Sequence, residues 1–177
     1  MKKTIAIIIL IITFLILYFL QSNFFKWFTI AGVSPNLFVV FILFISLFAG
    51  WKLGVPFGVC AGLFLDLIIG KKIGTCAIML GLIGFIGGYF DKTFSKESRI
   101  TIMLMVIGST CIFEIGTYIL QVIQLSINIE IWPFIKILLI EVLYNTILTI
   151  ILYSLIQKLG YKLEDTFKEQ RILTRYF

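Results

Sequence analysis

Three carboxylic acids lie inside long runs of apolar residues, and their chemistry needs an explanation. They are Asp66 in GVCAGLFLDLIIG, Glu114 in CIFEIGTYILQ and Glu141 in LLIEVLYNTILTI. A charged side chain at the centre of a membrane helix costs about 2.5–3.5 kcal/mol on insertion scales, so each acid is expected to face the bundle interior, a watery cavity or a partner. Acids in such places serve proton relays, acid–base catalysis or structural hydrogen bonds.

The residues that usually turn a buried acid into a catalytic centre are absent from this sequence. It contains no histidine, the commonest general base and metal ligand. Its three cysteines fall in different apolar runs without metal-ligand spacing, and the sequence has neither a nucleophile beside a base nor a phosphate-binding loop. We therefore predict that the protein is not an enzyme and has no catalytic residues, no cofactor and no bound metal.

Polar residues extend from each glutamate along one face of its predicted helix. The face of Glu114 also carries Thr117, Tyr118 and Gln121, and the face of Glu141 also carries Tyr144, Asn145 and Thr149. The candidate buried polar cluster comprises Glu114, Tyr118, Gln121, Glu141 and Asn145. Desolvation and the proximity of like charges both favour the neutral form, so we predict that at least one of the two glutamates is protonated at neutral pH.

The three acids are predicted to lie toward the outer half of the bundle. Counting from the outer helix ends at about 1.5 Å per residue places Asp66 roughly 6 Å deep, Glu141 roughly 12 Å and Glu114 roughly 17 Å. This arrangement fits either a cavity that opens outward or a hydrogen-bonded strut between helices, and the sequence leaves both open.

A ridge of small residues leads to the aspartate: Gly54, Gly58 and Gly62 repeat at intervals of four, and Asp66 continues the spacing. In a membrane helix such residues form a groove in which another helix backbone can approach closely. We take these four residues as a candidate helix-packing or partner face. The neighbouring helix could come from the same chain or from a partner, and the sequence does not choose between them.

The composition places these elements in a membrane. Hydrophobic residues make up 60% of the 177-residue chain and charged residues 14%, against about 45–50% and 25% in soluble domains. Helices are predicted at residues 4–20, 36–50, 54–69, 73–90, 100–125 and 133–157. The fold class is thus an all-α integral membrane protein with six transmembrane helices, whose transmembrane domain covers 1–157. Residues 158–177 are predicted to form a short cytoplasmic tail with an amphipathic helix, because Leu159, Leu163 and Phe167 are four apart.

The basic residues predict the orientation of the six helices. If the amino terminus is inside, eleven of the 15 lysines and arginines fall on the cytoplasmic side. The four outside are Lys26, Lys71, Lys72 and Lys136. Both termini are therefore predicted to be cytoplasmic. The net charge of +6 is explained by this topology and by contact with membrane lipid, without a nucleic-acid partner.

Several of these residues, taken in order, resemble the rod shape-determining protein MreD family. The resemblance rests on the sequence SPNL at 34–37, on Gly50 and Gly54, on GVCAGLFLDL ending just past Asp66, and on Gly74. Glu114 falls where that family often has an acid in its fifth helix. The resemblance covers essentially the whole chain in length and helix number.

The resemblance implies a non-catalytic membrane scaffold in the bacterial plasma (inner) membrane that belongs to the cell-wall elongation machinery. The implied direct partner is MreC, bound through transmembrane helices. Through MreC the protein would join MreB and the peptidoglycan synthase pair of RodA and a penicillin-binding protein. The implied role is maintenance of cell shape.

The alternative is a vitamin-binding subunit of an energy-coupling-factor transporter, because MreD is similar in its expected six-helix fold to the S component of such transporters. An S component would use an outward cavity, which the acids in the outer half could line. The first predicted helix has Ala6 as its only alanine and lacks the paired-alanine motif that many S components use to meet their coupling subunit. The scaffold function is therefore favoured.

Overall fold

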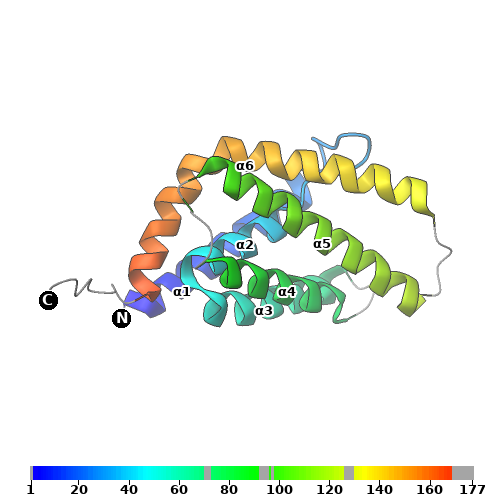
Figure 1. The fold of residues 1–177 in the computed structure, drawn as a ribbon. Helices are drawn as coiled ribbons and strands as arrows, with labels where there is room; N and C mark the ends of the chain where they lie inside the picture. The colour runs from blue at the N-terminus through cyan, green and yellow to red at the C-terminus, as the bar shows by residue number, and fades with distance from the viewer. Residues whose placement is uncertain (1, 70–72, 92–95, 97, 126–129, 169–177) are drawn as a thin grey trace, which may run out of the picture.

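The computed structural model describes residues 2–69, 73–91, 96, 98–125 and 130–168, and every regular element in these ranges is helical (Figure 1). In chain order the elements are α1 (Lys2–Phe19), the π-helical turn η1 (Leu20–Phe24), α2 (Leu37–Ala49), α3 (Trp51–Ile69), α4 (Thr75–Phe90), α5 (Arg99–Leu125) and α6 (Ile131–Phe167). The prediction of an all-helical chain with six helices is confirmed for these residues.

Four helical segments among the described residues are long and apolar enough to cross a membrane: Lys2–Phe24, Trp51–Ile68, Arg99–Gln124 and Ile131–Phe167. The other two helices, α2 and α4, have 13 and 16 residues. These lengths correspond to about 20 and 24 Å, against a hydrocarbon core of about 30 Å. Length and composition thus support membrane crossing for four of the six predicted spans, while α2 and α4 are shorter than the hydrocarbon core is thick.

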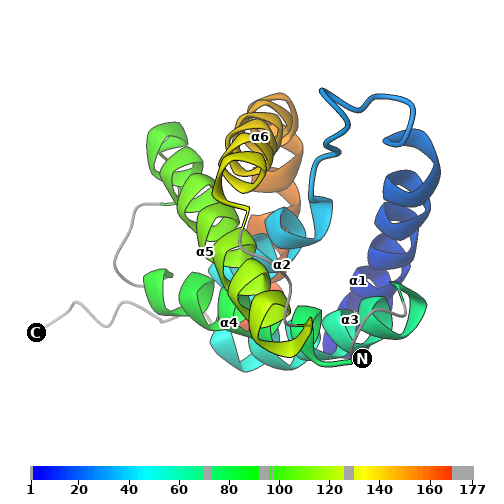
Figure 2. The same cartoon turned by 90° about the vertical axis from the view of Figure 1, so that its right-hand side faces the viewer.

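The centre of the fold is α2, whose sequence LFVVFILFISLFA offers no polar face. A helix of this kind is stable when it is buried on all sides. Twelve of its 13 residues are buried, and it contacts α1, α3, α4, α5 and α6. Figure 2 shows α2 between α1 on one side and α5 on the other, with α3 and α4 below it. The other five α-helices therefore surround α2.

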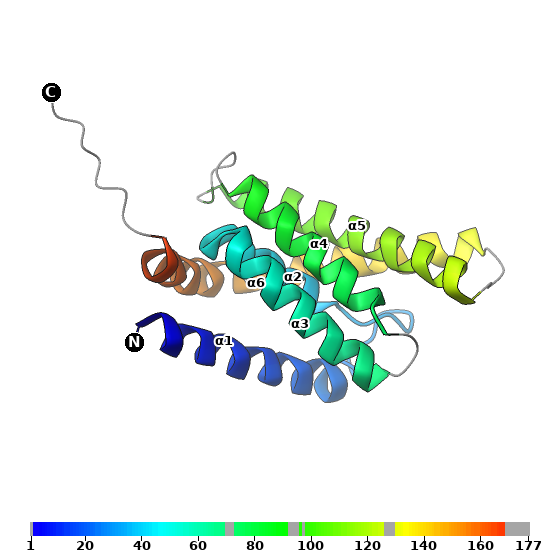
Figure 3. The same ribbon diagram turned by 90° about the horizontal axis from the view of Figure 1, so that it is seen from below.

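A tight turn joins α2 to α3. Gly50 adopts a φ of +86°, which suits glycine because it has no Cβ. Its N–H donates to the carbonyl oxygen of Ser46 at 2.9 Å and closes the last turn of α2. Beyond the turn, α3 pairs with α4, and Figure 3 shows these two helices side by side along their length.

The last helix is longer than predicted. We expected α6 to end at residue 157 and a separate short amphipathic helix to lie in the tail that follows, but α6 continues without a break to Phe167. A contact with the core explains the difference, because Gly160 is buried against the ring of Phe48 and the Tyr161 ring lies 5.6 Å from that ring, edge to face. Figure 1 shows the final part of α6 turned toward the start of α1, so these two helix ends lie at the same end of the fold.

Candidate functional site

A polar cavity of about 270 Å³ lies at the opposite end of the fold, where η1, α3 and α5 end and where α2 and α4 begin. One face of α5 contributes Glu114, Thr117, Gln121 and Gln124. The other elements contribute the polar side chains of Gln21, Asn36, Asp66 and Thr75. None of the described residues that line the cavity is a lysine or arginine, so its charged groups are carboxyls.

Asp66 caps the amino terminus of α4. Its Oδ2 accepts hydrogen bonds from the N–H groups of Gly74 at 2.8 Å and Ala77 at 3.2 Å, and its Oδ1 accepts one from the N–H of Cys76 at 2.9 Å. The first N–H groups of a helix have no partner within it and carry the positive end of the helix dipole. Gly74 has no side chain to cap them. Asp66 is only 4% exposed, and these three donors compensate for its burial.

The amino terminus of α2 is also capped by side chains from other elements. The Asn36 N–H donates to Asn145 Oδ1 of α6 at 2.8 Å, and the Leu37 N–H donates to Gln21 Oε1 of η1 at 3.0 Å. Asn36 itself accepts from the Val39 N–H at 3.4 Å. Both short helices therefore begin at the cavity with their N–H groups satisfied inside the fold, which lets them start below the membrane surface.

The two predicted glutamates meet beside this cavity. Glu114 lines it, and the Glu141 carboxyl lies close enough to Glu114 and to the side chain of Asn36 to interact with both. Glu141 is 6% exposed, and its Oε1 has no hydrogen-bond partner among the described residues. One turn further along α6, Asn145 is fully buried and donates to Thr110 Oγ1 at 3.1 Å. These contacts join α6 to α5 and to the start of α2.

The predicted polar cluster is thus brought together in part. Glu114 and Gln121 line the cavity, and Glu141 and Asn145 lie behind it. Tyr118 lies elsewhere: its ring stacks on Phe134 at 4.3 Å, and its hydroxyl accepts a hydrogen bond from the Glu130 N–H at 3.0 Å. Both a cavity and a hydrogen-bonded strut are present, so the two interpretations left open by the sequence describe adjacent parts of one site.

Sequence reasoning missed several residues of this site. Gln21, Thr75, Gln124 and Thr110 carry no motif, and they enter the site only because their helices converge there. Asn36 did give a signal, since an Asn after Pro35 at the start of an apolar run is a helix N-cap pattern. Its second contact, with α6, had no local sequence signal.

The glycine ridge packs against α4 of the same chain. A Cβ at Gly58 would lie 2.5 Å from the Leu80 carbonyl oxygen, and a Cβ at Gly62 would lie 2.5 Å from the Ala77 nitrogen. A Cβ at Gly54 would collide with Ser46 of α2. At these separations the helix backbones are in contact, and a partner helix could reach the ridge only if α4 left it.

A second recess remains on the outer surface between α4 and α5. It measures about 330 Å³ and is almost entirely apolar; its lining includes Ile86 and Phe90 of α4, Leu104 and Gly108 of α5, and Leu43 of the central helix. A Cβ added at Gly108 would meet nothing within 4 Å, unlike every other described glycine within an α-helix. Gly108 therefore faces open space in this recess.

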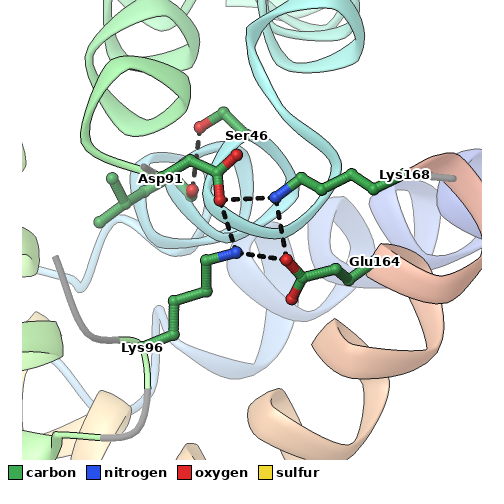
Figure 4. A network of polar contacts seen from close by, with 6 residues as sticks. Ser46, Asp91, Lys96, Glu164 and Lys168 are labelled. Atoms are coloured by element: carbon green, nitrogen blue, oxygen red, sulfur yellow. Dashed lines mark hydrogen bonds and ion pairs between the residues drawn. The ribbon is translucent and has the colours of Figure 1, made fainter. Parts of the chain in front are cut away.

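Four charged side chains form a compact network at the end of the fold where α1 begins (Figure 4). The Lys96 ammonium lies 2.5 Å from Asp91 Oδ1 and 2.6 Å from Glu164 Oε1, and the Lys168 ammonium lies 2.5 and 3.1 Å from the same two oxygens. Asp91 follows α4, Lys96 precedes α5, and the other two close α6. The network thus ties the last turn of α6 to the connection between α4 and α5.

The network shifts the pKa values of its two lysines in opposite directions. Burial alone would lower the pKa of Lys96, but its hydrogen bonds to the Asp91 and Glu164 carboxylates outweigh burial and raise that pKa above 10.5. Burial lowers the pKa of Lys168, and the neighbouring Lys96 ammonium adds to this effect, so that pKa falls below 10.5. The network therefore favours the charged form of Lys96 and disfavours that of Lys168.

The geometry of the cavity limits the chemistry that it can perform. Its carboxyls and amides can accept hydrogen bonds and attract positive charge. The described residues include no group of three His, Cys, Asp or Glu side chains able to hold a metal ion. The cavity is therefore equipped for recognition of a polar group and for joining helices.

Comparison with known proteins decides the family. The family model described as rod shape-determining protein MreD matches residues 1–162 of the chain. The chain belongs to the MreD family. The match begins at the first residue and extends past Gly160, so it covers all six helices except the last turns of α6. A search of curated proteins and a search of solved structures each found no match. Membership of the MreD family gives this membrane protein a role in the determination of rod shape.

Proposed function

We propose that this MreD-family protein is a non-catalytic assembly subunit of the cell-wall elongation complex in the bacterial plasma membrane. In this proposal it binds MreC directly through membrane helices and is joined through MreC to MreB and to the RodA and penicillin-binding protein synthase. The observation that carries the proposal is the family match over residues 1–162, which spans the helices that would contact a membrane partner. The vitamin-transporter alternative receives no support from the comparisons and is not proposed.

The arrangement of the helix ends supports cytoplasmic termini. The start of α1 and the end of α6 lie at one end of the fold (Figure 1), as expected for six helices that alternate in direction. The ion-pair network also lies at this end, together with Lys2, Lys3 and Lys52. An accumulation of basic residues on one side is typical of the cytoplasmic face of a membrane protein.

We place the MreC helix in the recess between α4 and α5. The glycine ridge is occupied by α4, whereas Gly108 faces open space within an apolar recess. Membrane helices associate where a small residue lets two backbones approach, because close packing provides the attraction that the hydrophobic effect cannot provide in lipid. A single partner helix crossing α5 at Gly108 would make such a contact and would reach Leu43 at the floor of the recess.

The test is co-purification with MreC after brief crosslinking in mild detergent at native protein levels, with mass spectrometry to identify the partners. A Cβ at Gly108 meets nothing within 4 Å, and Gly108→Leu places its added bulk in the recess, so we expect a normal protein level and at least a several-fold loss of recovered MreC. Cys60→Leu is the matched control, because it adds similar bulk at an exposed position on α3.

The outcomes separate the two parts of the proposal. Equal recovery of MreC from Gly108→Leu and from the parent protein would refute the recess as the docking face. Absence of MreC and of the wall-synthesis enzymes from the parent sample would refute the proposed function itself.

A further inference from the structure

The polar cavity has the charge and lining of a ligand site. We propose that it binds a positively charged organic group that donates hydrogen bonds, namely an ammonium or a guanidinium. This inference concerns a different region from the recess between α4 and α5 and does not depend on the proposed partner.

The charge of the cavity selects a cation. Asp66 and Glu114 present carboxyls to it, and the described lining contains no basic side chain. The three N–H groups at the start of α4 offset part of the charge of Asp66. Glu141 lies behind Glu114, outside the lining of the cavity, and its buried Oε1 has no partner among the described residues.

The other walls favour an organic cation over a bare metal ion. Phe38 and Phe113 line the cavity, and aromatic ring faces attract ammonium and guanidinium groups. Gln121 and Gln124 add amide groups that can accept hydrogen bonds from such a ligand. The volume of about 270 Å³ leaves room for a small head group and is large for one ion.

Two sources could supply this group. The cavity lies at the end of the bundle, where η1, α3 and α5 finish, so both a free amine and the head group of phosphatidylethanolamine are within reach. Both carry an ammonium, and the experiment below distinguishes them.

Cys76 provides a reporter, because its side chain lines the cavity. In a Cys60→Ala, Cys111→Ala background it is the remaining thiol. We would measure the rates at which ethylammonium and ethylsulfonate methanethiosulfonates modify it, each divided by the rate for a free thiol in the same detergent. A negative cavity should give a preference of at least about tenfold for the cationic reagent.

Two variants and one control keep the test independent of folding defects. Glu114→Gln removes one carboxyl of the pair that shares a proton and should lower the preference, whereas Gln121→Glu adds a carboxyl and should raise it several-fold. Glu164→Gln is the same exchange at the opposite end of the fold and should leave the preference unchanged. Equal normalised rates for the two reagents, or a preference that neither cavity variant alters, would overturn the proposal.

Protection of Cys76 from neutral methyl methanethiosulfonate tests binding itself. Ethanolamine, added to protein in phosphatidylglycerol nanodiscs, should slow modification if a free amine binds. Phosphatidylethanolamine nanodiscs should slow it without additive if the lipid head group binds. A lack of protection in both arms would refute the ligand site even if the charge preference were present. Neither result involves MreC, so a failure here would leave the proposed function untouched.

Discussion

Replacement of Asp66 by alanine tests the explanation given for the aspartate in an apolar helix. The change removes the acceptor for three N–H groups at the start of α4, those of Gly74, Cys76 and Ala77. Hydrogen bonds to a charged acceptor contribute about 1.5–3 kcal/mol each to stability. At the lower value the three bonds contribute about 4.5 kcal/mol.

Water in the adjacent cavity reduces this loss. Water can replace one or two of the three acceptor contacts at little cost, so we expect Asp66→Ala to lower the free energy of unfolding by about 1.5–3 kcal/mol. Asp66→Asn keeps one carbonyl oxygen as an acceptor and should lose at most half as much. The loss of stability should arise mainly at the contact between α3 and α4, because Asp66 joins these two helices.

The assay is equilibrium unfolding of the purified protein in mixed micelles with increasing dodecyl sulfate, followed by circular dichroism. Asp165→Ala removes an exposed acid near the end of α6 and serves as the control, with an expected change within about 0.5 kcal/mol. A change of less than about 0.5 kcal/mol for Asp66→Ala would show that the capping interaction does not stabilise the fold, and the reasoning would be wrong.

Three further predictions concern other parts of the fold. Gly58→Leu should lower the level of folded protein far more than Gly108→Leu, because a Cβ at Gly58 meets the α4 backbone whereas Gly108 faces open space. Equal protein levels in an immunoblot of the membrane fraction would contradict this. Infrared spectra should show a band from a protonated carboxyl, because the Glu114 and Glu141 carboxyls lie close together and can share a proton. Glu114→Gln should weaken this band and Glu164→Gln should leave it intact. A band unaffected by Glu114→Gln would argue against a shared proton. The raised pKa of Lys96 means that its contribution to stability is complete below pH 10.5 and is lost as the pH rises through the folded-state value. The parent protein should therefore lose more stability above about pH 10.5 than Lys96→Met protein does, and parallel pH profiles of these two proteins would refute this.

Much of the fold was predictable from local pattern. Continuous apolar runs fix the positions of the helices, because a backbone in lipid must satisfy its hydrogen bonds within the helix. The predicted and observed bounds agree within a few residues for the second and fifth helices, at Leu37–Ala49 and Arg99–Leu125. The end of α6 was missed because the contact of Gly160 with Phe48 joins residues more than a hundred positions apart.

The sequence by itself determined that the chain is a helical membrane protein of the MreD family, and that its acids and glycines belong at helix contacts. Burial of a charge and close approach of helices have residue-type requirements that can be read locally. The tertiary structure alone decided which groups satisfy those requirements: α4 covers the glycine ridge, Asp66 caps α4, and Asn145 reaches the start of α2. Residues brought together from five separate helical segments also create the cavity and leave Gly108 uncovered. Such pairings depend on how whole helices cross, and no local pattern specifies that crossing.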